Sequence, residues 1–109
     1  MRTRLILVLL AMPVGALTAY AAGETTIVQA GQAFSQTDVT IAAGDHIKFT
    51  NQDDVKHNIV VEAADDEDNS KDMGVQQPGA FVVVPFDKAG KFKVRCHIHP
   101  DMLLNVTVK

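Results

Sequence analysis

Residues 91–96 read KFKVRC, and charged and apolar side chains alternate along this stretch. Alternation with a period of two residues is the pattern of a β-strand that has one face in water and the other in the core. Cys96 falls on the same face as Phe92 and Val94, while the basic side chains fall on the opposite face. The stretch therefore predicts a half-buried strand and directs the only thiol of the chain into the interior.

Six other short segments are rich in the Val, Ile, Phe and Thr residues that β-strands favour. They lie at residues 25–30, 38–41, 46–51, 58–62, 81–86 and 103–109. Turn sequences with Gly, Pro, Asn or Asp separate them, as in AGD at 43–45 and PG at 78–79. About seven strands with no helical periodicity between them predict an all-β fold, an antiparallel Greek-key sandwich or barrel of about seven to eight strands.

One segment between the predicted strands is strongly acidic. Residues 62–72 read EAADDEDNSKD and hold six acidic side chains against the single base Lys71. A run of like charges favours a solvated segment, and its ordinary role is solubility. We therefore predict an acidic loop at this place.

Residues 1–21 have the three-part pattern of a secretory signal peptide. Two arginines precede an uncharged apolar run, and small residues at the end of the segment suit cleavage after Ala21 or one residue later. Pro13 interrupts the run before it reaches the roughly 20 apolar residues that span a membrane. We predict export, to the periplasm in a bacterial host, with no stable membrane insertion after cleavage, and one mature domain over residues 22–109.

The composition of residues 22–109 limits the possible partners. Removal of residues 1–21 takes away two of the ten basic residues, so the net charge of −3 becomes −5. Such a surface argues against nucleic acid as a partner. A domain of this size buries about 60% of its unfolded surface and gains from a metal or a cross-link. One cysteine cannot form an internal disulfide, so its thiol must be buried, paired between chains or bound to a metal.

The connection between the last two predicted strands carries a metal-binding pattern. Cys96, His99 and Met102 follow one another at the spacing C-x-x-H-x-x-M. Thiolate, imidazole and thioether together favour copper, whereas zinc gains little from a thioether. A blue-copper centre takes two histidines, one cysteine and a weak axial methionine, so a second histidine is required. His57 is the best candidate, because it opens a predicted strand whose start can lie beside the end of the strand before Cys96.

Two segments around these residues resemble the cupredoxins, in particular the plastocyanin and amicyanin group. One is GDHIKFTN at 44–51 followed by HNIV at 57–60, and the other is FDKAGKFKVRC at 86–96, which runs into the C-x-x-H-P-x-M loop. The resemblance covers nearly all of residues 24–109. The short loop after Cys96 is more similar to amicyanin than to plastocyanin.

The resemblance implies a fold, a cofactor and a role. The fold is an eight-stranded Greek-key barrel, and the role is the shuttling of single electrons as a monomer between a donor and an acceptor, for example a c-type cytochrome or a quinoprotein dehydrogenase. Asn58 matches the residue that ties the first-ligand loop to the cysteine loop and so fixes ligand geometry. The implied cofactor is one type 1 copper, with His57, Cys96, His99 and Met102 as its expected ligands.

Two positions depart from the family pattern. Ile98 stands where proline is common, and a second leucine follows Leu103 where a glycine-containing turn is frequent. Neither departure removes a ligand.

His97 and His99 form an H-x-H pair, a pattern that is also found in three-copper clusters. Such a cluster is built from eight histidines, whereas this chain has four. His97 is predicted to point to solvent, because it follows the inward Cys96 by one residue.

Three other functions use some of the same residues. A copper-binding or copper-delivery module without electron-transfer turnover uses the same ligands, so the sequence leaves it open. A metal-free sandwich adhesion domain with a buried Cys96 is also left open, and a copper titration distinguishes it. A thiol enzyme with His99 as base needs an exposed thiolate beside a cleft, whereas Cys96 is predicted to point inward. We therefore expect no enzymatic activity.

Overall fold

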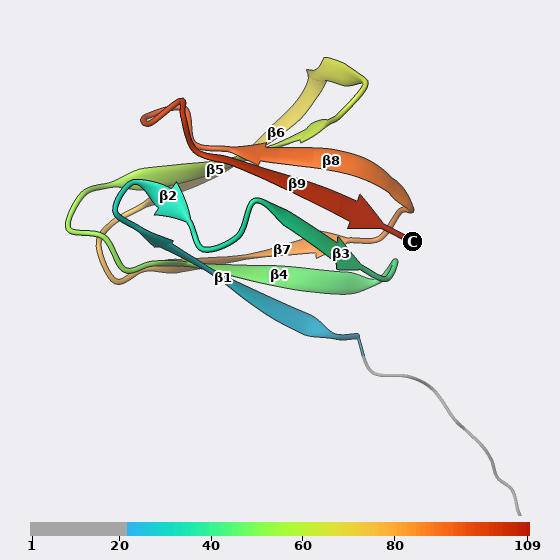
Figure 1. The fold of residues 1–109 in the computed structure, drawn as a ribbon, viewed down its shortest axis with the longest axis horizontal. Helices are drawn as coiled ribbons and strands as arrows, with labels where there is room; N and C mark the ends of the chain where they lie inside the picture. The colour runs from blue at the N-terminus through green and yellow to red at the C-terminus, as the bar shows by residue number, and fades with distance from the viewer. Residues whose placement is uncertain (1–21) are drawn as a thin grey trace, which may run out of the picture.

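The computed structural model describes residues 22–109, which form nine β-strands in two sheets (Figure 1). The predicted leader at residues 1–21 lies outside the described residues. The strands are β1 Glu24–Ala30, β2 Ala33–Phe34, β3 Asp38–Ile41, β4 Asp45–Asn51, β5 His57–Ala63, β6 Asp66–Gln76, β7 Phe81–Phe86, β8 Gly90–Arg95 and β9 Leu103–Val108. Across this part of the chain, no helix is long and apolar enough to cross a membrane.

The two sheets pack face to face, which confirms the predicted all-β sandwich (Figure 1). One sheet has the order β2-β1-β4-β7 and the other the order β3-β9-β8-β5-β6. The seven predicted strands all form, each within one residue of its predicted bounds. Both sheets are mixed, because β1 pairs with β4 and β3 with β9 in parallel, and the remaining pairs are antiparallel as expected. The parallel partners are far apart in the chain, so no tight hairpin forces them to run in opposite directions.

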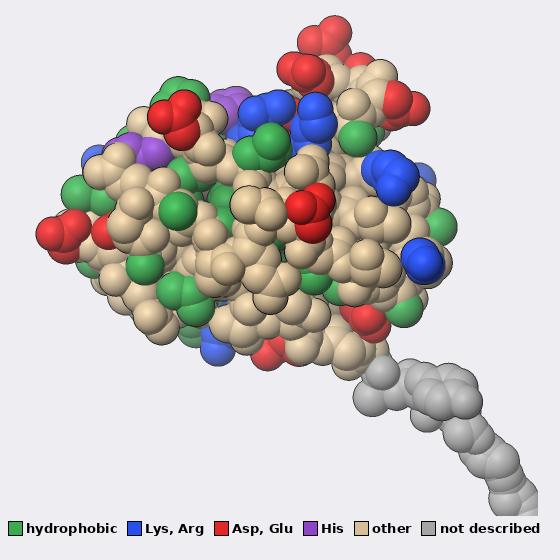
Figure 2. Space-filling model, viewed as in Figure 1, with side chains coloured by type: hydrophobic (Ala, Val, Ile, Leu, Met, Phe, Trp, Pro, Cys, Tyr) green, Lys and Arg blue, Asp and Glu red, His purple; other side chains and the backbone are tan. Residues whose placement is uncertain are grey.

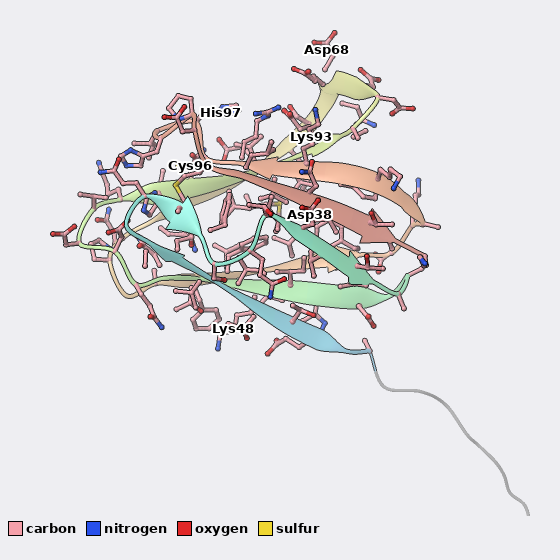
Figure 3. All side chains as sticks on the ribbon, viewed as in Figure 1. Asp38, Lys48, Asp68, Lys93, Cys96 and His97 are labelled. Atoms are coloured by element: carbon pink, nitrogen blue, oxygen red, sulfur yellow. The ribbon has the colours of Figure 1, made fainter. Side chains whose placement is uncertain are left out.

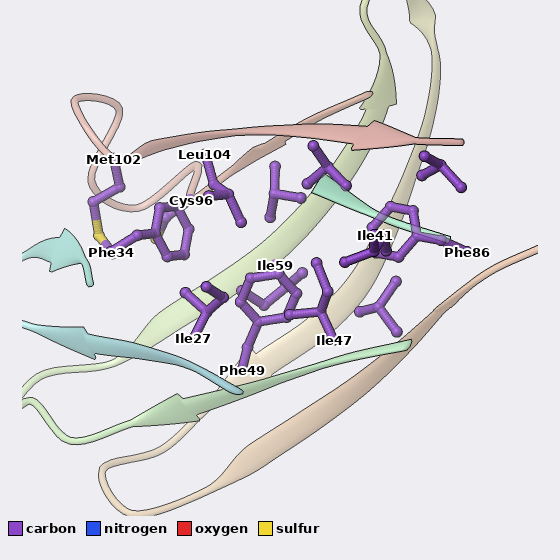
Figure 4. Close-up of a cluster of buried hydrophobic side chains, with 14 residues drawn as sticks. Ile27, Phe34, Ile41, Ile47, Phe49, Ile59, Phe86, Cys96, Met102 and Leu104 are labelled. Atoms are coloured by element: carbon purple, nitrogen blue, oxygen red, sulfur yellow. The ribbon is translucent and has the colours of Figure 1, made fainter. Parts of the chain in front are cut away.

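The alternation along the strands fills the space between the sheets with apolar side chains. Phe34 and Phe49 meet edge to face at 5.9 Å, and Phe86 meets Phe92 in the same way at 5.6 Å. The buried core cluster consists of Ile27, Phe34, Ile41, Ile47, Phe49, Ile59, Val84, Phe86, Val94, Cys96, Met102, Leu104, Val106 and Val108 (Figure 4). Two of the predicted metal ligands are therefore part of the core itself.

The acidic segment departs from the sequence-based prediction. We predicted an acidic loop at residues 62–72, but most of this segment belongs to β6, which pairs with β5 as a long hairpin that projects from the sandwich (Figure 1). Figure 2 shows the acidic side chains gathered on this projection. Pairing with β5 satisfies backbone groups along one side of β6 while the carboxylates stay in water. Charge on such an edge strand also opposes pairing with another chain.

Candidate metal centre

The fold brings His57 to the loop that holds the other three predicted ligands. β8 ends at Arg95, and residues 96–102 connect it to β9. β5 runs antiparallel to β8 with Val60 opposite Arg95, so the first residues of β5 lie beside the end of β8. His57 opens β5 and therefore lies at the same end of the sandwich as Cys96, as the sequence predicted.

Cys96 and His57 face each other in the interior. Both side chains have no exposed surface, and Sγ of Cys96 lies 3.6 Å from Nδ1 of His57. The predicted inward direction of the thiol is confirmed, and Figure 3 shows His97, the next residue, at the surface. A sulfur and an imidazole nitrogen that face each other away from solvent form a donor pair suited to a soft or borderline metal.

His99 and Met102 lie in the same group. The rings of His57 and His99 meet edge to face, with centroids 4.8 Å apart. Nε2 of His99 is buried and has no hydrogen-bond partner among the described residues. A buried ring nitrogen without a partner is costly unless it binds something. Met102 is 2% exposed, and its backbone N–H donates to the carbonyl of His99 at 3.0 Å, which closes the loop.

The donor set of these four side chains fits copper. It offers one thiolate, two imidazoles and one thioether, a combination that suits copper better than zinc. Among residues 22–109, no group of three or more His, Cys, Asp and Glu side chains lies in a position to hold a metal ion without Met102. The structure thus brings the four predicted residues to one place, and their ligand roles stay a prediction.

Asn58 ties β5 to the cysteine loop, as the family resemblance implied. Its side-chain oxygen accepts a hydrogen bond of 2.7 Å from the backbone N–H of His97, and its own backbone N–H points at Sγ of Cys96 at 3.4 Å. Its amide nitrogen donates to Oδ2 of Asp72 at 3.4 Å, a contact that the sequence analysis did not foresee. Asn58 therefore holds the thiol and the residue after it in a fixed relation to His57.

Asp53 is the site residue that sequence reasoning missed. Its Oδ2 lies 2.9 Å from Nε2 of His57 and also accepts the backbone N–H of Gln32 at 2.8 Å. The hydrogen bond from His57, and then that from Gln32, lower the pKa of Asp53 below its ordinary value. The available signal was the position of a carboxylate four residues before the predicted ligand, in the turn that precedes β5.

The other two histidines and Met73 do not join the centre. His46 faces outward and forms an ion pair with Glu24 at 3.0 Å. His97 is exposed, as its position after Cys96 predicted. Met73 packs against the core from β6, where its flexible side chain fills space.

Comparison with known proteins identifies the family. Residues 21–109 match the copper binding proteins of the plastocyanin/azurin family. The chain belongs to this family. The resemblance to cupredoxins is thereby confirmed, and the cofactor is a single copper ion. Cupredoxins in general carry electrons and are not enzymes.

One relative is similar in sequence to part of this cupredoxin. Methylamine utilization protein MauL of Methylophilus methylotrophus is 36% identical over 77 residues, which are 69% of this chain and 43% of that protein. The chain thus spans less than half the length of this relative.

Two solved structures show the same fold. A purple cupredoxin from Nitrosopumilus maritimus superimposes with a TM-score of 0.67 at 22% identity, over 77% of this chain and 98% of that chain. The Cu(I) form of an amicyanin variant with one methionine replaced by alanine gives a TM-score of 0.71 at 20% identity, over 83% and 86% of the two chains.

Proposed function

We propose that this cupredoxin is an exported electron carrier of the periplasm, with one type 1 copper held by His57, Cys96, His99 and Met102. It passes single electrons between two redox proteins and has no enzymatic activity of its own. The observation that carries the proposal is the contact of 3.6 Å between the fully buried Sγ of Cys96 and Nδ1 of His57. Their burial and mutual orientation serve a buried metal better than they serve a nucleophile, which needs an accessible thiolate.

Each side chain has a distinct task at such a centre. When bound, copper supplies one-electron chemistry by alternating between Cu(I) and Cu(II). Cys96 provides the sulfur donor, and His57 and His99 provide nitrogen donors. Met102 offers a weak axial thioether. Because Cys96 and Met102 belong to the close-packed core, the donors have little freedom to move when the charge of the centre changes.

The loop that holds His99 supplies the route to a partner. Ile98 is 43% exposed and Pro100 is also exposed, whereas Leu103 is half-buried, so apolar surface flanks His99 at the end of the sandwich. Short-lived redox complexes need only small interfaces. We place the transfer of the electron at His99, because it connects this exposed loop to the buried pair of Cys96 and His57.

The relative MauL suggests a metabolic setting. Its name assigns it to methylamine utilization. Oxidation of an amine releases electrons that need a carrier, so a quinoprotein dehydrogenase is a suitable donor and a c-type cytochrome a suitable acceptor. The acidic surface of residues 22–109 favours partners with basic surfaces around their redox groups.

The proposal is tested by stopped-flow mixing of the copper-loaded protein with a c-type cytochrome. An electron carrier exchanges electrons rapidly and reversibly in both directions, and it keeps its copper through repeated cycles. Substitution of Ile98 by Ser should slow this exchange, whereas Val83→Ser, an exposed apolar site of similar exposure on β7, serves as the matched control. Loss of copper to a copper-free acceptor protein, without redox exchange, would instead support copper delivery and contradict the proposal.

A further inference from the structure

The carboxylate of Asp53 decides which nitrogen of His57 carries a proton. An ionised carboxylate only accepts hydrogen bonds, and Oδ2 of Asp53 lies 2.9 Å from Nε2 of His57. Nε2 must therefore carry the hydrogen. In the neutral ring this leaves the lone pair on Nδ1, the atom that faces Sγ of Cys96 at 3.6 Å. The hydrogen bond thus selects the tautomer in which His57 can bind a metal beside Cys96.

Asp53 is itself held from three sides. Its backbone N–H donates to Oδ1 of Asn51 at 2.9 Å, and its Oδ2 accepts the backbone N–H of Gln32 at 2.8 Å. Asn51 is fully buried and donates to the carbonyls of Val55 and Gln76 at 2.9 and 3.1 Å. The Asp53 side chain is only 12% exposed. The carboxylate cannot swing into solvent without breaking its hydrogen bonds to His57 and Gln32.

The contact with Gln32 joins the centre to the other sheet. Gln32 lies in the turn between β1 and β2 and has φ of +56°, a left-handed conformation unusual for a residue other than glycine. Its N–H is directed at Asp53 in that conformation. One oxygen atom therefore links the β1–β2 turn, the turn before β5 and the ring of His57.

We infer that Asp53 is a positioning residue of the metal centre, which orients His57 and stabilises the oxidised copper relative to the reduced copper. The inference rests on the proposed function, because it assumes that His57 is a ligand. A partner that accepts a hydrogen bond from a ligand histidine fixes the ring and raises its basicity. Its negative charge, shielded from water on most sides, favours the ion of higher positive charge.

The decisive variant is Asp53→Asn, which keeps the shape and one acceptor oxygen but removes the charge. At a fixed potential, the ratio of Cu(II) to Cu(I) should be about tenfold lower than in the wild type. This corresponds to a rise of about 59 mV in the reduction potential. The intense visible band should stay, because Cys96 is untouched. The control is Asp54→Asn, which removes the same charge from the exposed neighbouring residue and should leave the potential close to that of the wild type.

A second variant separates orientation from charge. Asp53→Ala removes the acceptor altogether and should weaken Cu(II) binding about 10- to 100-fold, the usual cost of losing such a partner. In the metal-free protein, ¹⁵N NMR should show His57 as the Nε2–H tautomer in the wild type and as a mixture of tautomers in Asp53→Ala. This measurement needs no copper, so it tests Asp53 even if the proposed function fails.

Two results would overturn the inference. One is an equal potential in Asp53→Asn and Asp54→Asn. The other is an unchanged His57 tautomer in Asp53→Ala. If either variant merely lowers the melting temperature while potential and tautomer stay the same, Asp53 is a structural residue of the turn and not a positioning residue. Absence of the visible band in the wild type would contradict the proposed function instead.

Discussion

The two ends of the sandwich treat polar side chains in opposite ways. At the end with the 96–102 loop, polar groups such as those of His57 and Asn58 are buried and have specific partners. At the other end, β6 carries its carboxylates in water (Figure 2). Burying a polar group is costly unless it is paired, so the first end is constrained and the second tolerates change. A substitution of the same chemical kind should therefore have very different effects at the two ends.

The largest expected contrast is between Cys96→Ser and Asp68→Asn. The serine hydroxyl cannot donate charge to copper as a thiolate does, so Cys96→Ser should abolish the intense visible band of the copper protein. Asp68 is exposed on the hairpin, and its substitution should leave both the band and the stability unchanged within about 0.5 kcal/mol. Absorption spectra of the two copper-loaded variants test this. An intense band in Cys96→Ser would show that the thiolate of Cys96 is not its source.

A smaller contrast is expected between Asn58→Ala and Ser70→Ala. Asn58→Ala leaves the backbone N–H of His97 without its acceptor, and an unsatisfied partly buried donor costs about 1–3 kcal/mol. Ser70 is exposed on β6, so its truncation should cost less than about 0.5 kcal/mol. Urea unfolding of the metal-free proteins measures both values. Equal losses would mean that Asn58 does not hold the cysteine loop.

The two core-packed methionines sharpen the contrast further. Met102→Gln should keep copper and lower the reduction potential, since the harder amide oxygen favours Cu(II) over Cu(I). Met73→Gln, on β6, should lower the stability of the fold, because Met73 packs against the core. It should leave the reduction potential unchanged. Redox titration of both variants distinguishes them. A higher potential in Met102→Gln would contradict the axial role of Met102.

The smallest expected effect concerns acid, at the end of the sandwich away from the metal centre. Hydrogen bonds from the backbone N–H of Ala42, and then of Gly23, lower the pKa of Asp45 below its ordinary value of 3.8. A lowered pKa in the folded state means that stability is present above pH 3.8 and is lost as the pH falls through the folded-state value. The stability advantage of the wild type over Asp45→Asn should be constant above about pH 5 and shrink below it. Denaturation over a pH series from about 3 to about 7 measures this, and a constant difference would rule it out.

The sequence predicted most of the fold and the candidate ligands, because both depend on local patterns. Alternation in 91–96 placed Cys96 in the core, and the spacing to His99 and Met102 needed no tertiary information. The strand β6 was missed, since its charged residues lack periodicity and it forms through pairing with β5. β2 was also missed, because its two residues are too few for any pattern.

The hydrogen-bond partners of His57 and Asn58 could not be predicted, because these contacts also depend on how distant segments pack. Asp53 and Asp72 look like ordinary surface acids in the sequence. Their contacts with His57 and Asn58 appear only when β5, β6 and the preceding turn are assembled. Residue types suffice to name a donor set, whereas the groups that orient the donors depend on chain packing.

We propose that one buried group of donors, and not the exposed acids or His97, holds the metal. Titration of residues 22–109 with Cu(II), followed by visible absorption and native mass spectrometry, tests it most directly. We predict an intense thiolate-to-copper band that saturates at one copper per chain. A weak spectrum without this band, or continued uptake of several ions per chain, would mean that copper binds at the surface and would contradict the account.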